Sequence, residues 1–124
     1  MSGSKCPCAG IDKEGIFERD GVYCVIGPRY VLAFTQALAS ETRIRILELL
    51  RSGVGSLDEI SERLGQSKAN ISNQVKRLED VGLIYGFYEA GRRGIKKRVR
   101  SSFRAAVLAL DPEGLRAACG GEEP

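Results

Sequence analysis

The sequence predicts an α+β fold in which a helical core carries a β-hairpin, and three observations predict it. Residues 56–82 have the pattern of two short helices joined by a tight turn. Residues 83–100 hold two β-prone runs separated by a glycine-bounded basic turn, Gly91-Arg92-Arg93-Gly94. Two further helical patterns, residues 28–38 and 40–51, precede the helix pair. Helices followed by such a hairpin predict a winged helix-turn-helix with a small β-hairpin before it.

Composition narrows the class of protein. The chain has 124 residues, which is one domain, small enough to favour pairing with a second copy. No apolar stretch is long enough to span a membrane, and the first ten residues lack the apolar centre of a signal peptide, so we expect a cytoplasmic protein. Histidine is absent, which removes the commonest general base. With no phosphate loop either, the sequence does not predict an enzyme.

The helix pair carries start and stop signals. The first helix begins at Ser56, because Ser56 and Glu59 have the spacing of a capping box. It ends at Gly65, since the left-handed conformation costs glycine least. Ser67 can cap the second helix, which ends at Gly82. Apolar residues recur at helical spacing on one face of each helix: Leu57, Ile60 and Leu64, then Ile71, Val75 and Leu78.

The opposite face of the second helix is polar in a way that suits DNA. Four of the five side-chain amides in the protein lie within residues 66–74. Asn and Gln can bond adenine, whereas Lys and Arg reach guanine or phosphate. Amides also gather where helices start, which would explain Gln66 or Asn70 better than Asn73 or Gln74. We predict base reading by Asn70 and Asn73, with Gln66 and Gln74 as further candidates, and phosphate contacts by Ser67, Lys68 and Lys76. The full predicted set is Gln66, Ser67, Lys68, Asn70, Asn73, Gln74, Lys76 and Arg77.

The hairpin after this helix is strongly basic. Between Gly91 and Arg104 there are seven basic residues and no acidic one. Preventing aggregation would by itself be a sufficient reason for basic residues on an exposed strand. Strand alternation would also put about half of them on the other face of the hairpin. A purely positive run exceeds that need, so we predict that the hairpin contacts double-stranded DNA. Arg92 and Arg93 would reach the flanking DNA backbone or the minor groove. The phosphates along the backbone would be contacted by Lys96, Lys97 and Arg98.

The ends of the chain are assigned to smaller parts. Residues 1–13 read as a flexible cysteine-containing arm, and residues 14–27 as a β-hairpin turning at Asp20-Gly21. Residues 28–110 form the winged helix-turn-helix domain in this interpretation. Within it, residues 103–110 fit a strand and a helix almost equally, and we choose the strand. Residues 111–124 are a short C-terminal helix with a tail, capped by Asp111.

The helix at residues 28–38 is apolar around most of its circumference, whereas one contact with the core needs only a stripe. The excess predicts a homodimer interface, and the alternative is that the N-terminal hairpin covers it. The predicted interface residues are Tyr30, Val31, Phe34 and Leu38.

Four cysteines, Cys6, Cys8, Cys24 and Cys119, allow several interpretations. They could hold zinc or an iron–sulfur cluster, although C-x-C is not the usual C-x2-C knuckle. They could instead form disulfides or a redox site. Alternatively, Cys24 is a small buried residue in a strand and Cys119 is incidental.

The run ALASETRIRILELL, followed by SLDEISERLGQSKANISNQVKRLEDVGLI, resembles the ArsR family of prokaryotic repressors over about residues 30–110. The wing GRRGIKKRV resembles an archaeal and bacterial subgroup. The resemblance implies a homodimer that binds an inverted repeat and represses transcription.

Two departures limit what the resemblance implies. Many members bind metals through cysteines on the first helix of the pair, where this chain has none, and others use histidines. The effector is therefore not given by the resemblance, and a thiol- or metal-responsive regulator remains one alternative. Another is a winged-helix protein–protein module, which the amides and the basic wing disfavour, because protein interfaces carry less charge at their centres.

Overall fold

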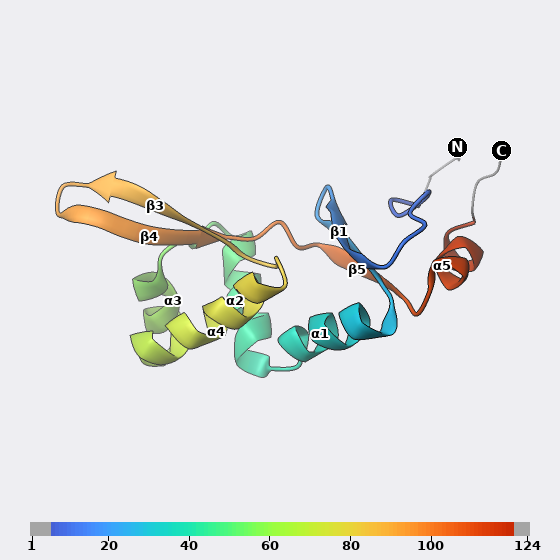
Figure 1. Ribbon diagram of the computed structural model, residues 1–124. Coiled ribbons are helices and arrows are strands. Elements are labelled where there is room, and N and C mark those ends of the chain that lie inside the picture. The colour runs from blue at the N-terminus through green and yellow to red at the C-terminus, as the bar shows by residue number, and fades with distance from the viewer. Residues whose placement is uncertain (1–5, 121–124) are drawn as a thin grey trace. The chain divides into compact units, whose positions relative to one another are not determined.

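The computed structural model describes residues 6–120, and it contains five helices and five strands in that range (Figure 1). The chain forms two compact units. One combines the residues up to Thr35 with those from Phe103 onward, and the other comprises Gln36–Ser102. The predicted single domain over residues 28–110 therefore needs correction, because the strand after residue 103 pairs with the N-terminal hairpin and not with the wing.

The first unit is built on a three-stranded sheet. Its strands are β1 (Gly15–Arg19), β2 (Val22–Ile26) and β5 (Ala105–Ala109), in the order β1-β2-β5. β1 and β2 form the predicted antiparallel hairpin, and both turn residues have positive φ, 55° at Asp20 and 82° at Gly21. β5 pairs with β2 in parallel, which confirms a strand in residues 103–110.

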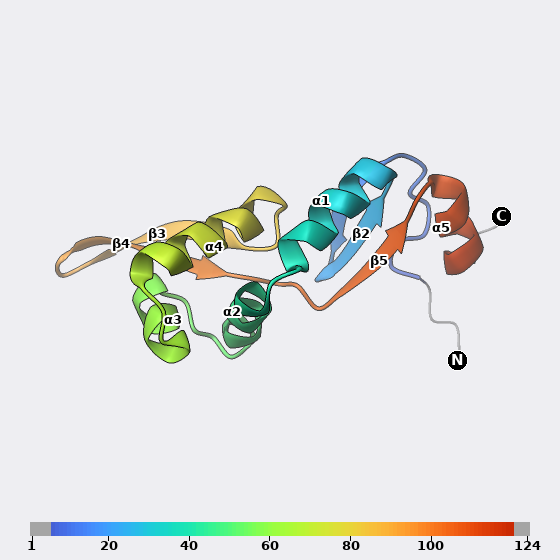
Figure 2. The same cartoon turned by 90° about the horizontal axis from the view of Figure 1, so that it is seen from below.

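One face of this sheet packs on aromatic rings. Helix α1 (Pro28–Leu38) follows β2 and runs alongside the sheet (Figure 2). The rings of Tyr23 and Phe34 lie 5.8 Å apart, and each also contacts Phe103. Phe34 is completely buried in its own chain. Its prediction as an interface residue therefore needs correction, because this part of the apolar surface of α1 is buried within the subunit.

The other face of the sheet packs on the N-terminal turn and on α5 (Pro112–Cys119). Asp111 caps α5 as predicted, with its Oδ1 accepting from the Gly114 amide over 2.6 Å. Residues 6–13 are not the loose arm that the sequence suggested, because Cys8 and Ile11 are buried in the apolar cluster of this face. Residues 1–5 of that predicted arm and residues 121–124 of the predicted tail lie outside the described residues.

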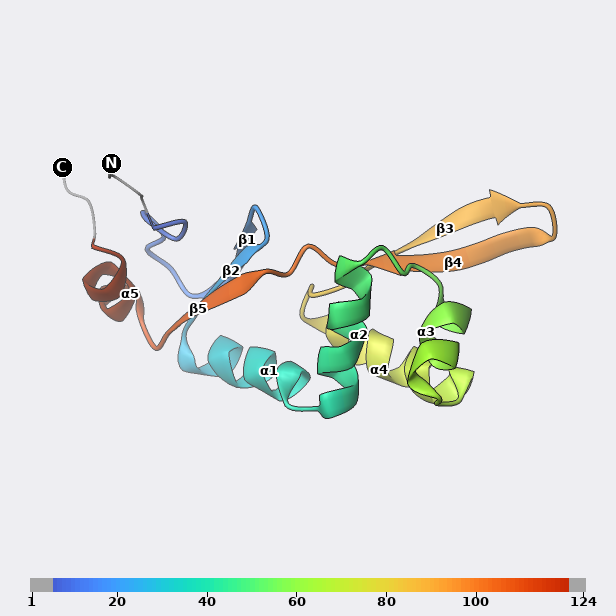
Figure 3. The ribbon, with the colours of Figure 1, turned by 180° about the vertical axis from the view of Figure 1, so that it is seen from behind.

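The second unit contains the predicted helices and wing (Figure 3). Helices α2 (Glu41–Arg51), α3 (Leu57–Leu64) and α4 (Lys68–Asp80) precede an antiparallel hairpin of β3 (Tyr85–Gly91) and β4 (Gly94–Arg100). Serine side chains cap all three helices, and Gly65 ends α3 in the left-handed conformation. The core contains Ile60, Ile71, Val75 and Leu78, which the periodicity placed inward, together with Ile46, Leu47 and Leu50 of α2 and with Leu83, Ile84 and Val99.

Within residues 6–120, none of the helices is both long enough and apolar enough to cross a bilayer.

Candidate nucleic-acid interface

The second helix of the pair, α4, separates its residues into an inward and an outward face. Ile71, Val75 and Leu78 are buried at helical spacing. Asn73, Lys76 and Arg77 are exposed on the other side. Because the buried stripe fixes the rotation of the helix, these three side chains are held outward, where a ligand can reach them.

The remaining amides of this region are tied together by hydrogen bonds. Gln66 donates to Thr42 Oγ1 over 3.0 Å, Asn70 donates to Gln66 Oε1, and Gln74 donates to Asn70 Oδ1 over 3.3 Å. All three amides are half-buried. They therefore act first as a polar connection between α2 and α4, and Asn73 is the one amide of α4 without such a bond in the described part of the chain.

Arg43 of α2 completes this connection. Its Nη1 donates to Gln74 Oε1 over 2.6 Å, and its Nε and Nη2 donate to the carbonyls of Ala37 and Gln36 at the end of α1. The side chain thus adds a donor to two carbonyls at the end of α1, of which the Gln36 carbonyl also accepts from the backbone amide of Ala39. Burial lowers the pKa of the Arg43 guanidinium, and the nearby positive charge of Arg77 lowers it further. An arginine stays charged in proteins nonetheless, so this contact persists across the working pH range.

Two residues at the start of α4 also make contacts within the fold. The Ser67 hydroxyl caps the helix by accepting a hydrogen bond from the backbone N–H of Asn70 over 3.1 Å. Lys68 pairs with Asp58 of α3 at 3.0 Å, with both side chains largely exposed. Such a pair contributes little to stability, so Lys68 can exchange Asp58 for a phosphate.

The strand register determines on which face of the wing each basic residue lies. Arg92 and Arg93 form the exposed tip between β3 and β4. The pairing sets Lys96 opposite Glu89 and Arg98 opposite Phe87, so Lys96 and Arg98 share one face, while Lys97, opposite Tyr88, belongs to the other. The predicted basic residues of the wing are therefore divided between its two faces.

Two of these positive charges have acidic partners. Lys97 pairs with Glu79 of α4 at 3.3 Å, and Arg98 pairs with Glu89 of β3 at 3.5 Å. The Lys97–Glu79 pair lies over Gly86, where an added Cβ would come within 2.5 Å of Glu79 Oε2. The sequence count missed these pairs, because the carboxylates come from outside residues 91–104.

Sequence reasoning also missed a set of exposed aromatic residues on the wing. Tyr85, Phe87 and Tyr88 of β3 are exposed, Tyr88 to 71%. The signal was present in the sequence, since three aromatics in four residues on a two-stranded hairpin leave at least one ring without cover.

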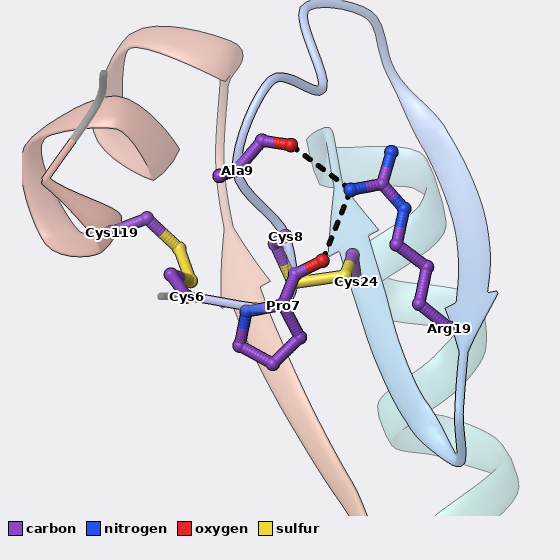
Figure 4. Close-up of a disulfide and its surroundings, with 7 residues drawn as sticks. All are labelled: Cys6, Pro7, Cys8, Ala9, Arg19, Cys24 and Cys119. Atoms are coloured by element: carbon purple, nitrogen blue, oxygen red, sulfur yellow. Dashed lines mark hydrogen bonds between the residues drawn. A yellow bond between two sulfur atoms is a disulfide. The ribbon is translucent and has the colours of Figure 1, made fainter. Parts of the chain in front are cut away.

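The four cysteines belong to the first unit and are paired there. Disulfides join Cys6 to Cys119 and Cys8 to Cys24 (Figure 4). Disulfide formation was one of the interpretations that the sequence left open. Cys24 is also buried in a strand, as the sequence suggested. The sulfur atoms of Cys6, Cys8 and Cys119 all lie within 4.8 Å of one another.

A helix pair with an outward polar face, followed by a basic two-stranded hairpin, defines the class: the chain carries a winged helix-turn-helix domain. Residues 38–84 match the family model described as a helix-turn-helix domain. The chain is similar to the HTH-type transcriptional regulator CmtR of Mycobacterium bovis, with 39% identity over 73 residues, covering 59% of this chain and 60% of CmtR. It therefore spans about three-fifths of the length of this relative.

A solved structure gives the same result. A homodimeric winged helix-turn-helix DNA-binding domain from Mycobacterium bovis, described as a possible ArsR-family transcriptional regulator, matches with 26% identity and a TM-score of 0.51, covering 58% of this chain and 63% of that one. The NMR structure of CmtR from Mycobacterium tuberculosis, titled a cadmium metal-sensor, has 34% identity and a TM-score of 0.48, covering 57% of this chain and 70% of that one. The resemblance to ArsR-family regulators that the sequence indicated is confirmed.

Proposed function

We propose that this protein is a homodimeric, sequence-specific DNA-binding transcriptional regulator, with repression as its mode of action. The observation that carries the proposal is the outward face of α4, where Asn73, Lys76 and Arg77 are exposed opposite a buried stripe. The basic wing belongs to the same unit and adds a second positive surface. The similarity to CmtR, which is named as a transcriptional regulator, supports the same conclusion.

At the DNA, α4 would lie in a major groove and the wing would follow the backbone beside it. Asn73 is the primary base-reading residue in this proposal, because its amide is exposed and not used within the described fold. Asn70 is held by Gln66 and Gln74, so it would read a base only by exchanging one of those hydrogen bonds. Lys76, Arg77, Arg92 and Arg93 would hold phosphates, and these contacts position the protein without reading sequence.

The dimer is proposed through α1. Tyr30, Val31 and Leu38 remain half-exposed, and Leu32 is 58% exposed, so apolar surface is left after Phe34 has been buried. Two copies related by a two-fold axis would present their α4 helices to grooves one DNA turn apart, about 34 Å. The operator would then be an inverted repeat. The homodimeric solved relative supports this arrangement.

In this proposal, the effector acts by binding to the cysteines or reacting with them. The sequence allowed zinc or an iron–sulfur cluster at Cys6, Cys8, Cys24 and Cys119, and three of the four sulfurs lie close enough together to share an ion. A response through these thiols would make the regulator metal- or thiol-dependent. We place its action in the cytoplasm, where prokaryotic DNA lies.

The experiment is a selection of bound duplexes from a random library, followed by binding measurements on the selected sequence and on a scrambled control. The proposal expects a palindromic consensus and an affinity for the selected duplex at least 10³-fold above that for the control at physiological salt, on the order of known specific binders. Equal affinity for both duplexes at every salt concentration would contradict sequence-specific recognition. Sedimentation of the free protein then checks the dimer.

A second candidate, a protein–protein module, is favoured by one observation, the exposed aromatics of β3. Aromatic side chains are enriched at protein interfaces. A variant with Phe87→Ser and Tyr88→Ser separates the two functions. Under our proposal it keeps the specificity for the selected duplex, whereas the protein module predicts no selected duplex for either form.

A further inference from the structure

The four cysteines converge from three separate segments of the first unit. Cys6 and Cys8 lie in the N-terminal turn, Cys24 lies in β2, and Cys119 is the last residue of α5 (Figure 4). Cys8 and Cys24 are completely buried, and Cys6 and Cys119 are partly buried. Four cysteines that are distant in the sequence thus meet in one cluster, where the structure pairs them in two disulfides.

Three of the four sulfurs lie close enough to one another to share one ion. Three of them, from Cys6, Cys8 and Cys119, lie within 4.8 Å of one another, and the fourth belongs to Cys24, which is joined to Cys8. In a tetrahedral site with metal–sulfur bonds of about 2.3 Å, neighbouring sulfurs are about 3.8 Å apart. A four-iron cluster places iron and sulfide between its thiolates and therefore needs wider spacing.

The backbone around the cysteines is already held in place. Within the N-terminal turn, the Ala9 amide donates to Cys6 O over 3.1 Å and the Ile11 amide donates to Cys8 O over 3.4 Å. Arg19 of β1 donates from Nη1 to Pro7 O at 3.0 Å and to Ala9 O at 2.9 Å (Figure 4). These bonds fix the turn that carries two of the cysteines. They also hold a positive guanidinium against the turn.

The surroundings exclude water from half of the cluster. Ile11, Ile26 and Leu115 are buried around Cys8 and Cys24. Buried thiolates without a counter-charge would be costly there, whereas a bound divalent ion offsets two of the four negative charges. A reducing compartment does not maintain disulfides. The reduced cluster therefore has three sulfurs within 4.8 Å of one another and a fourth, that of Cys24, beside Cys8, and a thiophilic cation would stabilise them as thiolates.

We propose that, in the reduced protein, Cys6, Cys8, Cys24 and Cys119 together bind one thiophilic divalent cation of the zinc and cadmium type as a four-thiolate centre. Conversion from the disulfide form needs a two-electron reductant, such as a dithiol or a phosphine with water, which supplies two electrons and two protons to each disulfide. The four thiols then lose four protons as four metal–sulfur bonds form. Because protons are released, affinity for the ion rises with pH. The centre deepens the proposed function by naming its effector, and it rests on that function only for its regulatory role.

The test uses the full chain, reduced with a phosphine without oxygen and then freed of excess reductant. Cadmium chloride is titrated in while the ultraviolet thiolate-to-metal charge-transfer absorption and the released protons are measured. The proposal expects the absorption to saturate at one ion per chain with about four protons released at a pH below the thiol pKa values. It also expects zinc to compete for the same site. No saturation, or iron and sulfide in protein purified without oxygen, would overturn the proposal.

Two variants define the ligands. Cys6→Ser and Cys119→Ser change partly buried residues, so the unit keeps its buried pair, and each is expected to lose at least tenfold in cadmium affinity. Asp12→Asn removes an exposed carboxylate near the turn and is expected to bind as the unchanged protein does. Equal affinity in both cysteine variants and the unchanged chain would overturn the four-thiolate assignment. Far-ultraviolet circular dichroism checks that each variant is folded.

The regulatory role is measured separately on the selected duplex. A change in DNA affinity between the metal-loaded and metal-free reduced protein supports the role. One-to-one metal binding with the same DNA affinity in both forms overturns the role and leaves the centre standing. Failure of both forms to bind any duplex overturns the proposed function and not the centre.

Discussion

The Nη1 atom of Arg43 donates a hydrogen bond to Oε1 of Gln74 over 2.6 Å, and this contact fastens α2 to α4. Arg43 is buried, and its Nε and Nη2 atoms donate to the carbonyls of Ala37 and Gln36 in α1. The contact explains why Gln74, an amide on the flank of a helix assigned to DNA, points into its own fold. It also holds α4 in the orientation that presents Asn73.

Removing the acceptor should destabilise the helical unit. Gln74→Ala leaves a buried guanidinium with one unsatisfied donor, which costs about 1–3 kcal/mol of unfolding free energy. Asn73→Ala is the matched control on the same helix, and its cost should stay within about 0.5 kcal/mol because the side chain is exposed. Chemical denaturation followed by circular dichroism measures both. Equal losses in the two variants would contradict a structural role for Gln74.

Neutralising Glu79 should strengthen DNA binding without changing its specificity. Glu79→Gln removes the partner of Lys97, which then becomes free for a phosphate. The slope of log affinity against log salt should become steeper by about 0.9, the value for one extra phosphate contact. Glu48→Gln on the exposed side of α2 makes the same charge change away from the wing. A similar gain in that control would indicate an effect of net charge alone.

Removing both arginines of the wing tip should weaken binding to every sequence. Arg92→Ala with Arg93→Ala deletes two exposed charges, and the salt slope should fall by about 1.8, the value for two phosphate contacts. Arg29→Ala with Arg51→Ala, on α1 and at the end of α2, removes the same charge elsewhere. Titrations at four salt concentrations measure the slopes. An unchanged slope in the wing variant would rule out phosphate contacts by the tip.

The turn between α3 and α4 should depend on glycine for its backbone alone. Gly65 has φ of 65°, and an added Cβ would meet no atom within 4 Å. Gly65→Ala should therefore cost about 1 kcal/mol through the left-handed conformation and not through a clash. Gly65→Asn should cost less, because asparagine tolerates this conformation better than alanine. Thermal unfolding of both variants checks the order, and a larger loss for asparagine would contradict it.

Much of the fold could be predicted because its signals are local. Ser40, Ser56, Ser67 and Asp111 cap helices as their positions indicated, and Asp20-Gly21 turns the first hairpin. Each of these features depends on a few neighbouring residues. The inward stripe of α4 was equally predictable, since three residues at helical spacing define it.

The pairing of β5 with β2 could not be predicted, because it joins residues about 80 positions apart and no periodicity encodes it. The same limit applies to the burial of Phe34 by Phe103 and to the meeting of Cys6 with Cys119. At the candidate interface, composition identified the amides but not their roles. Their hydrogen bonds depend on Thr42 and Arg43 of a different helix.

The central claim, that the outward face of α4 reads bases, is tested most directly by Asn73→Ala. Dissociation constants are measured on the selected duplex and on its scrambled control at one salt concentration. We expect a loss of about 1–3 kcal/mol of binding free energy on the selected duplex and none on the control. Equal losses on both duplexes, or no loss on either, would contradict base reading by this helix.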